Sequence, residues 1–352
     1  MKGVFLCAGK GTRMRPISYS TPKHLIPLAN KPILQYNVEK VIDAGITEVG
    51  LVVSPEMESL YRETLGTSKW GASITYIHQE NPRGLAHAVD CARDFVGDDP
   101  FLVYLGDNLL HSGLTGMVDG FKQESPAASI LLASVDDPER FGVAEIEDGK
   151  VVDLVEKPDD PPSDLAIVGA YLFNREIFSA IDRIEPSNRG ELEITDAIAL
   201  LISEGKNVTP SRLEGWWLDV GRPADALKAN RVLLGEIDGS VKGKVRDSEL
   251  TNRSEIVVAG DSRIENSVLR GPVHVEEGAR IVNSTVGPDA SIGENVDLQG
   301  SKVENSIIMS GTKVEKTEIT DSLVGSKAEI KLPAGNIRTT VGNHAKILAE
   351  GS

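Results

Sequence analysis

The last third of the chain repeats a short pattern and contains no aromatic residue. Residues 264–268 read Ile-Glu-Asn-Ser-Val, and related stretches recur at 281–285, 303–307 and 319–323. These recurrences lie on average about three hexapeptides apart, and aliphatic residues between them follow a beat of roughly six residues. Every Phe, Trp and Tyr precedes residue 240. The pattern predicts a parallel β-helix, in which each coil buries aliphatic and small residues against its neighbours.

The first two thirds of the chain alternate strand-like and helix-like segments. This alternation predicts a mostly parallel sheet with helices on both faces, whose ligands bind beyond the carboxyl ends of the strands. The length of 352 residues suits two domains, and we place their boundary where the aromatic residues stop, giving domains 1–239 and 240–352. The expected strands lie at 2–7, 49–53, 74–78, 101–105, 130–134 and 166–173, and the expected helices at 32–44, 85–95 and 191–204.

Charge and cysteine content exclude several classes of protein. The net charge of -16 argues against binding to nucleic acid, whose phosphate backbone requires a basic surface. The same acidity suits a protein of the cytoplasm and would also suit a salt-adapted one. The two cysteines offer neither a disulfide framework nor metal-ligand spacing. Because the N-terminal apolar run is too short for a signal peptide and no membrane-length stretch follows, we expect a cytoplasmic protein without a membrane partner.

A glycine-rich turn with basic residues follows the first expected strand. Gly9 and Gly11 allow backbone N–H groups to approach an anion closely, because glycine has no Cβ. Arg13 adds fixed positive charge, and Lys23 supplies another basic side chain downstream. The turn lacks the Gly-Lys-Ser/Thr of a P-loop and the third glycine of a dinucleotide fingerprint. A purely structural turn is the alternative, but the basic residues favour binding of a polyphosphate.

Two aspartates that follow apolar strands are candidate metal ligands. Asp107 comes directly after the apolar run that ends in Leu105-Gly106, and Asp219 follows Trp216-Trp217-Leu218. Carboxylate oxygens, together with substrate phosphates, are the usual ligands of Mg²⁺ in proteins. One such aspartate alone would more often cap a turn or helix. Two of them in a chain with a polyphosphate turn favour a Mg²⁺ site.

Further polar residues at strand ends suit a nucleobase and a sugar phosphate. Gln79 offers a donor and an acceptor, which matches the O4 and N3–H edge of thymine or uracil. Gly84 permits close backbone approach at the start of the next helix. Glu156 and Lys157 suit a sugar hydroxyl and a phosphate, and Arg189 suits a phosphate. Each also has a plain structural interpretation, as a surface glutamine, a loop ion pair or a helix-capping charge.

Together these motifs resemble the sugar-1-phosphate nucleotidylyltransferases, and within that family the long-form glucose-1-phosphate thymidylyltransferases. The resemblance covers nearly the whole chain. The β-helix expected at its C-terminal end is what distinguishes the long form from the short form. It implies an α/β fold: an N-terminal Rossmann-like nucleotidyltransferase domain with a mostly parallel mixed sheet, then a C-terminal left-handed parallel β-helix. The motifs that carry it lie at 9–16 (Gly-Lys-Gly-Thr-Arg-Met-Arg-Pro), 22–23, 30–33, 84–86, 105–108, 141–143, 156–158, 189–196 and 217–221.

The resemblance also implies a role for each matching residue. The catalytic residues would be Arg13, Lys23 and Lys157, and the Mg²⁺ ligands Asp107 and Asp219. The residues that would hold the nucleotide are Ala8, Gly9, Gly11, Thr12, Arg13, Lys23, Gln79, Gly84 and Asp107. The residues that would position the sugar phosphate are Asn108, Gly142, Glu156, Lys157, Ile167 or Val168, and Arg189.

The activity implied by the resemblance is Mg²⁺-dependent transfer of a thymidylyl group from dTTP to α-D-glucose 1-phosphate. Ala8 stands where many short-form members carry glycine and is shared with several uridylyltransferases, so UTP stays open as the nucleotide. Leu85, in Gly84-Leu85-Ala86, favours thymidine. A bifunctional enzyme whose β-helix transfers acetyl groups stays open too, as does a non-catalytic regulatory protein that binds nucleotide sugars. We expect copies of the chain to form a homo-oligomer through the β-helix.

Overall fold

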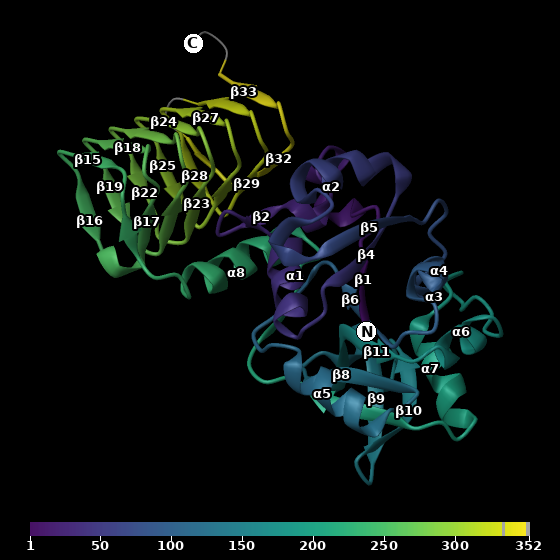
Figure 1. Ribbon diagram of the computed structural model, residues 1–352. Helices are drawn as coiled ribbons and strands as arrows, with labels where there is room; N and C mark the ends of the chain where they lie inside the picture. Colours follow the sequence, from purple (N-terminus) through teal and green to yellow (C-terminus); the bar gives the residue numbers. More distant parts are fainter. Residues whose placement is uncertain (333–334, 350–352) are drawn as a thin grey trace. The chain divides into compact units, whose positions relative to one another are not determined.

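The computed structural model describes residues 1–332 and 335–349, and the chain divides into two compact units (Figure 1). The first unit comprises Met1–Gly9 and Leu34–Asp219, and the second comprises Lys10–Ile33 and Val220–Ser352. The segment Lys10–Ile33 therefore groups with the C-terminal residues. The predicted boundary at residue 240 stays a prediction, and residues 333–334 and 350–352 of the predicted second domain lie outside the described residues.

A nine-stranded mixed sheet forms the centre of the first unit. Its strands β6, β1, β4 and β5 are neighbours in that order and run parallel. β11 runs antiparallel to β6, β8 and β9, which makes the sheet mixed. The parallel strands and this antiparallel one together confirm the predicted mostly parallel mixed sheet. The strands are β1 (Lys2–Leu6), β4 (Glu48–Val53), β5 (Ser73–His78), β6 (Phe101–Leu105), β8 (Ala128–Ser134), β9 (Gly142–Glu147), β10 (Lys150–Glu156), β11 (Leu165–Phe173) and β12 (Val208–Arg212).

Helices pack against this sheet, and all three expected helices have different bounds in the structure. The helix expected at 191–204 begins at Ile194, because Glu193 is extended with φ -83° and ψ 136°. The helix expected at 85–95 is two helices, because Ala92 leaves helical geometry at φ -89° and ψ 0°. Pro32 lies in the short strand β3 (Lys31–Pro32), which pairs with β2 (Pro27–Leu28), so the first helix begins one residue later than expected. The helices are α1 (Ile33–Asp43), α2 (Glu58–Leu65), α3 (Leu85–Cys91), α4 (Arg93–Val96), α5 (Thr115–Glu124), α6 (Glu176–Ile181) and α7 (Ile194–Ser203).

The second unit contains the predicted β-helix, built as three parallel sheets in which successive coils stack (Figure 1). Aliphatic and small residues fill its interior, which confirms the interpretation of the six-residue beat. The helix α8 (Pro223–Leu234) precedes it. The first sheet holds β14 (Ser240–Val241), β17 (Ile256–Val258), β20 (Val273–Val275), β23 (Ala290–Ile292), β26 (Ile307–Ile308), β29 (Leu323–Val324) and β32 (Thr340–Val341).

The other two sheets continue the same coils. Within the part of the chain that the structure describes, no helix is both long and apolar enough for a membrane crossing. The second sheet holds β15 (Lys244–Arg246), β18 (Arg263–Glu265), β21 (Arg280–Val282), β24 (Asp297–Gln299), β27 (Lys313–Glu315), β30 (Glu329–Lys331) and β33 (Lys346–Leu348). The third holds β16 (Glu249–Thr251), β19 (Val268–Arg270), β22 (Thr285–Val286), β25 (Lys302–Glu304), β28 (Glu318–Thr320) and β31 (Asn336–Ile337).

The recurring Asn-Ser pair forms a corner of the coil. Asn266 and Asn283 adopt left-handed backbone conformations with φ 48° and 49°, which asparagine tolerates better than most residues. The buried hydroxyls of Ser267 and Ser284 each donate to the carbonyl two residues earlier. Each hydroxyl also accepts a backbone N–H from the next coil, Ser284 N at 3.1 Å and Ser301 N at 3.0 Å. A continuous column of hydroxyls therefore explains why the pair recurs.

Candidate functional site

The carboxyl ends of β1 and β6 lie side by side, as the sequence predicts. The two strands pair in parallel with Leu6 opposite Leu105. Ala8 and Gly9 follow β1, and Asp107 follows β6, so the first part of the glycine-rich turn and the first aspartate leave the sheet at the same edge. This edge is the place where open α/β sheets bind ligands.

Two buried polar side chains that the sequence analysis missed brace these loops. Asn37 of α1 donates from Nδ2 to the Gly106 carbonyl at 3.1 Å. Tyr61 of α2 donates from its hydroxyl to the Cys7 carbonyl at 3.2 Å, and burial raises the pKa of Tyr61 well above its usual range, which keeps it a donor. No motif marks either residue, because each acts through backbone carbonyls that are distant in sequence.

A short antiparallel ladder sets one candidate metal ligand opposite the neighbour of the other. β7 (Asn108–Leu110) pairs with β13 (Trp217–Asp219), and Asp219 lies opposite Asn108, the neighbour of Asp107. Asn108 donates from Nδ2 to Asp107 Oδ1 at 3.1 Å and accepts from Trp217 Nε1 at 2.7 Å. No group of three or more His, Cys, Asp or Glu side chains suited to a metal occurs among the described residues. Two carboxylates are what a Mg²⁺ ion takes when phosphates and water complete its shell.

Gln79 is buried at the end of β5 and is bonded to a histidine. Its exposed fraction is 3%, and its Nε2 lies 2.8 Å from His87 Nδ1. Since an amide nitrogen can only donate, His87 Nδ1 must be the unprotonated acceptor. Burial, followed by the nearby Arg83 guanidinium, lowers the pKa of His87 and so favours this neutral form. A cavity of about 330 Å³ adjoins His87 and is also lined by Arg83 and Asp90.

Gly84 is required by a backbone contact rather than by open space. It has φ 112°, and a Cβ there would lie 2.4 Å from the Leu192 carbonyl oxygen. Leu192 donates its N–H to the Arg83 carbonyl at 2.7 Å and accepts from Ala86 N at 3.0 Å. The close approach expected at Gly84 is therefore made by the chain that precedes α7.

Charged residues gather around the end of β10. Glu156 Oε1 accepts from Lys157 Nζ at 2.8 Å and from Arg189 Nη1 at 3.1 Å. Arg189 also lies 3.4 Å from Glu193, whose pKa is raised mainly by burial. Burial and then the charge of Glu156 raise the pKa of Asp196. The structure thus brings together the predicted Glu156, Lys157 and Arg189 in a cluster rich in carboxylates, which are good acceptors for sugar hydroxyls.

Two glycines allow close contacts between this cluster, β11 and Asn108 of β7. A Cβ on Gly142 would lie 3.1 Å from Ile167 Cδ1, so the predicted Gly142 and Ile167 are in contact. Gly169 has φ 45°, and its Cβ would lie 2.8 Å from Asn108 Oδ1. Val168, between Ile167 and Gly169, is fully buried in β11. The predicted sugar-phosphate residues therefore line adjoining positions of the first unit.

The remaining predicted residues belong to the second unit. Gly11 has φ 57°, and its carbonyl accepts from Ser18 Oγ at 2.7 Å. Thr12 and Arg13 form a single 3-10 turn with Met14 and are exposed. A Cβ on Gly11 would lie 3.7 Å from Lys23 Cβ, so these two positions are neighbours.

Gly221 is a further residue of interest in the second unit, and the sequence analysis gave it no role. A Cβ there would lie 3.0 Å from Arg13 Nη2. The absence of a side chain at Gly221 therefore leaves room for the guanidinium of Arg13.

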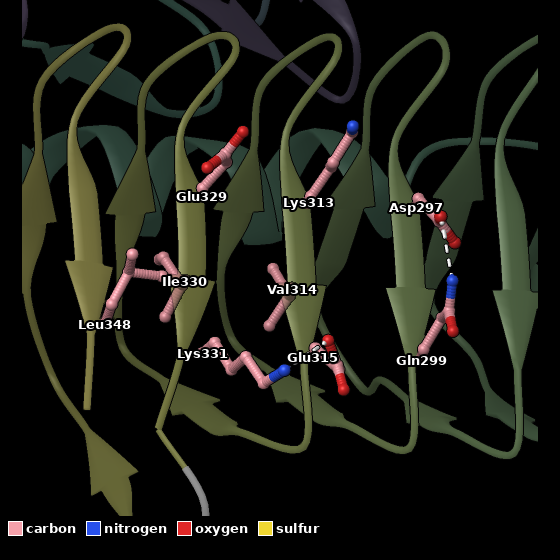
Figure 2. A pocket seen from close by; sticks show the side chains of 9 residues that line it. All are labelled: Asp297, Gln299, Lys313, Val314, Glu315, Glu329, Ile330, Lys331 and Leu348. Atoms are coloured by element: carbon pink, nitrogen blue, oxygen red, sulfur yellow. Dashed lines mark hydrogen bonds and ion pairs between the residues drawn. The ribbon is translucent and has the colours of Figure 1, made fainter. Parts of the chain in front are cut away.

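A groove of about 230 Å³ on the second sheet of the β-helix is not a comparable site (Figure 2). Two pairs of its polar side chains are in contact along the sheet. Lys331 Nζ lies 3.2 Å from Glu315, and Gln299 donates to Asp297 at 3.0 Å. We interpret this groove as the space between polar side chains on successive strands of the second sheet.

Comparison with known proteins places this geometry in context. The nucleotidyl transferase family model matches residues 2–236. The low-salt glycan biosynthesis nucleotidyltransferase Agl11 of Haloferax volcanii is 44% identical and the match covers 99% of each chain. A glucose-1-phosphate thymidylyltransferase of Streptomyces antibioticus is 42% identical, again over 99% of each chain. A solved structure from Bacillus anthracis, assigned as a glucose-1-phosphate thymidylyltransferase, matches with TM-score 0.63 and 38% identity over 68% of this chain and 97% of that one.

Proposed function

The chain belongs to the nucleotidyl transferase family, and on this premise we propose that it transfers a thymidylyl group from dTTP to α-D-glucose 1-phosphate. The products are dTDP-glucose and pyrophosphate. The full-length similarity to glucose-1-phosphate thymidylyltransferases of two Streptomyces species supports this choice of substrates.

One structural observation carries the proposal. The pairing of β7 with β13 sets Asp219 opposite Asn108, beside Asp107, at the sheet edge where ligands bind. Through Gly169, Asn108 also adjoins the β11 positions next to the Glu156 cluster. Hard anionic ligands next to a group of hydroxyl-binding residues are what a reaction between two phosphates, one of them carried by a sugar, requires.

We assign the binding roles by matching residues to substrate chemistry. Arg13 and Lys23 bind the triphosphate together with the amides of Gly9, Gly11 and Thr12, because cations and backbone N–H groups neutralise phosphate oxygens. Gln79 reads the pyrimidine edge, and Gly84 and Ala8 adjoin the nucleotide. The sugar phosphate is bound by Asn108, Gly142, Glu156, Lys157, Ile167 or Val168, and Arg189.

The residues fit a Mg²⁺ ion. Asp107 and Asp219 would hold it, since Asp219 pairs with Asn108, the residue that follows Asp107, and the described residues offer no larger cluster. When bound, the ion would neutralise charge on the phosphates.

The transfer needs no general base. A phosphate oxygen of glucose 1-phosphate, already an anion, forms a bond to the α-phosphorus of dTTP, and the bond from that phosphorus to the bridging oxygen breaks to release pyrophosphate. The protein's contribution is alignment of the two phosphates and compensation of their charge by Arg13, Lys23 and Lys157.

Pyrophosphate release across nucleotides and sugar 1-phosphates tests the proposal. We expect dTTP with glucose 1-phosphate to give the highest kcat/KM, and Asp107→Asn and Asp219→Asn to lower kcat by about 100- to 1,000-fold because charge compensation is lost. Arg175→Gln, at an exposed ion pair with Asp98, serves as the control that retains activity. Preference for UTP would instead favour a uridylyltransferase. Absence of turnover with every pair would favour a nucleotide-sugar-binding regulator.

Three broader expectations stay proposals. The predicted division at residue 240, association of copies through the β-helix and location in the cytoplasm are tested by proteolysis, light scattering and cell fractionation. The acetyl-transfer alternative is tested by acetyl-CoA consumption with glucosamine 1-phosphate. We expect none: the resemblance to bifunctional enzymes of this family would imply a His-x-x-Tyr pattern, and the C-terminal third has no Tyr.

A further inference from the structure

The outer face of one β-helix sheet is covered by other parts of the second unit. In the first sheet, Val273, Val275, Ala290 and Ile292 point into the β-helix interior. His274 lies between the two valines and Ser291 between Ala290 and Ile292, so both point outward. Ser291 pairs with Ile307, which has an exposed fraction of 0% although it lies in this outward row. Because this outward row excludes water, other residues must pack against it. The hydrogen bonds of the segment Lys10–Ile33 show that this segment supplies some of them.

The tip of the β2–β3 hairpin forms hydrogen bonds with this face and with Asn230 of α8. Ala29 N–H donates to Asn230 Oδ1 at 2.8 Å, and the Ala29 carbonyl lies 3.0 Å from His274 Nδ1. Asn30 Nδ2 lies 3.1 Å from two carbonyls of successive coils, those of His274 and Ile292. The hairpin tip is therefore bound to the β-helix by both its backbone and its side chain.

Asn230 of α8 is the central residue of this contact. Its exposed fraction is 1%, and its Oδ1 accepts from Ser291 Oγ at 2.7 Å as well as from Ala29 N. His274 is fixed in turn, because its Nε2 lies 3.2 Å from Glu276, and this partner lowers the pKa of the Glu276 carboxyl. Buried amides with two defined partners specify one geometry, since a lost partner would leave a buried polar group unpaired.

The backbone of the tip needs this support. Ala29 and Asn30 have φ 45° and 62°, the left-handed pair of a two-residue hairpin. Such turns strongly favour Asn-Gly, whereas an alanine in the left-handed region is disfavoured by its Cβ. The contacts with Asn230 and His274 hold Ala29 in a conformation that its own side chain opposes.

The other end of the segment is attached to the last described coils. Asn343 donates from Nδ2 to Thr21 Oγ1 at 2.9 Å, and a Cβ on Gly342 would lie 3.4 Å from Pro16 Cβ. Lys23 lies in sequence between Thr21 and the hairpin, and Arg13 lies just before Pro16. Lys23 is thus flanked by two attachments to the β-helix, and Arg13 lies three residues before the first of them.

We propose that the β-helix positions the nucleoside triphosphate, because Asn230 and His274 hold the segment Lys10–Ile33 in its binding conformation. The inference rests on the proposed function only in taking this segment as the triphosphate site. Asn230 and His274 are positioning residues, since each acts through the hairpin tip. The β-helix is then a part of the binding site's framework in addition to any role in assembly.

The test compares full-length variants in steady-state kinetics and limited proteolysis. For Asn230→Leu and His274→Ala we expect KM for dTTP to rise about tenfold, as loss of buried hydrogen bonds predicts, with KM for glucose 1-phosphate unchanged. Tryptic cleavage after Lys10, Arg13 and Lys23 should accelerate by a similar factor. His274→Asn, whose amide can donate to the Ala29 carbonyl, should restore both values.

Ser306→Ala is the matched control, since its buried hydroxyl donates to the Glu304 carbonyl inside the β-helix at 2.7 Å. It should lower Tm without changing KM for dTTP or the cleavage rate. The proposal is overturned if Asn230→Leu and His274→Ala lower Tm like Ser306→Ala while KM for dTTP and cleavage stay at wild-type values. A wild-type protein without turnover would refute the proposed function instead, and the cleavage comparison would still decide this inference. If Asn230→Leu does not fold, His274→Ala with its rescue decides alone.

Discussion

At the scale of single residues, the hydrogen bond between Gln79 and His87 bears on the base selection that we propose for Gln79. With Nε2 of Gln79 donating to His87, the other end of the amide is a carbonyl oxygen, an acceptor. An acceptor suits the N3–H of thymine or uracil and opposes the unprotonated N3 of cytosine. If Gln79 reads the base as we propose, His87 fixes which end of the amide meets it.

Replacement of His87 should weaken discrimination against CTP. In His87→Leu the Gln79 amide can rotate, so we expect the ratio of kcat/KM for dTTP over CTP to fall about tenfold, the worth of one well-placed hydrogen bond. Protonation should act in the same direction. Since burial and Arg83 lower the pKa of His87 from 6.5, the wild-type ratio should hold at pH 7–8 and decline only below pH 6.5.

A neighbour of His87 provides a control for this comparison. Cys91 Sγ lies 4.0 Å from its Nε2, and Asp90 and Arg83 act on its charge with opposite signs. Cys91→Ala should leave the dTTP-to-CTP ratio unchanged. A ratio in His87→Leu equal to that of wild type would show that Gln79 is oriented by another partner.

The sequence predicted Gln79 but not His87, and the reason is physical. Gln79 occupies a strand end, where chemistry can be anticipated from the strand pattern alone. His87 acts only because a turn brings the first coil of α3 back towards β5, and Gly84 makes that turn against the Leu192 backbone. Contacts of this kind depend on tertiary packing, and so do those of Asn37 and Tyr61.

At the scale of elements, the β-helix is the feature that the sequence predicted best. The repeat itself signals a stacked structure, because an identical corner can recur only if successive coils superpose. The hydroxyl column through Ser267 and Ser284 supplies the partner for one backbone N–H per coil. By contrast, the β9–β10 hairpin and α8 were not anticipated, although Asp148-Gly149 is a strong turn signal for the hairpin, with φ 48° and 77°.

Removal of one hydroxyl from the column should destabilise the β-helix. Ser284→Ala leaves the Ser301 N–H without its acceptor in a buried position, so we expect the free energy of unfolding to fall by about 1–3 kcal/mol. Circular dichroism is the suitable probe, because no Trp lies after residue 240. Ser310→Ala, an exposed serine of the same β-helix, should change stability by less than about 0.5 kcal/mol. Equal effects of the two substitutions would contradict the column's role.

At the scale of the whole molecule, the sequence predicted two architectures but not how the chain is shared between them. The aromatic break at residue 240 suggests a boundary, yet the segment Lys10–Ile33 groups with the C-terminal residues. Its attachment depends on single polar contacts such as Asn230 to Ala29, separated by 201 positions in sequence. A periodic pattern reveals which residues a β-helix buries inside, but it carries no information on what covers the outside.

Net charge gives a final prediction at this scale. With 53 acidic against 37 basic residues, the folded chain repels itself, and salt shortens the screening length from about 10 Å at 0.1 M to about 3 Å at 1 M. Salt also weakens exposed ion pairs such as Arg175 with Asp98, but each is worth only about 0–1 kcal/mol. Repulsion should dominate, so we expect Tm to rise by roughly 3 °C or more between 0.1 and 1 M NaCl. The double variant Asp159→Asn and Asp160→Asn, at exposed positions, should raise Tm at 0.1 M and leave it unchanged at 1 M. A Tm that falls with salt in both proteins would show that ion pairs outweigh the acidic excess.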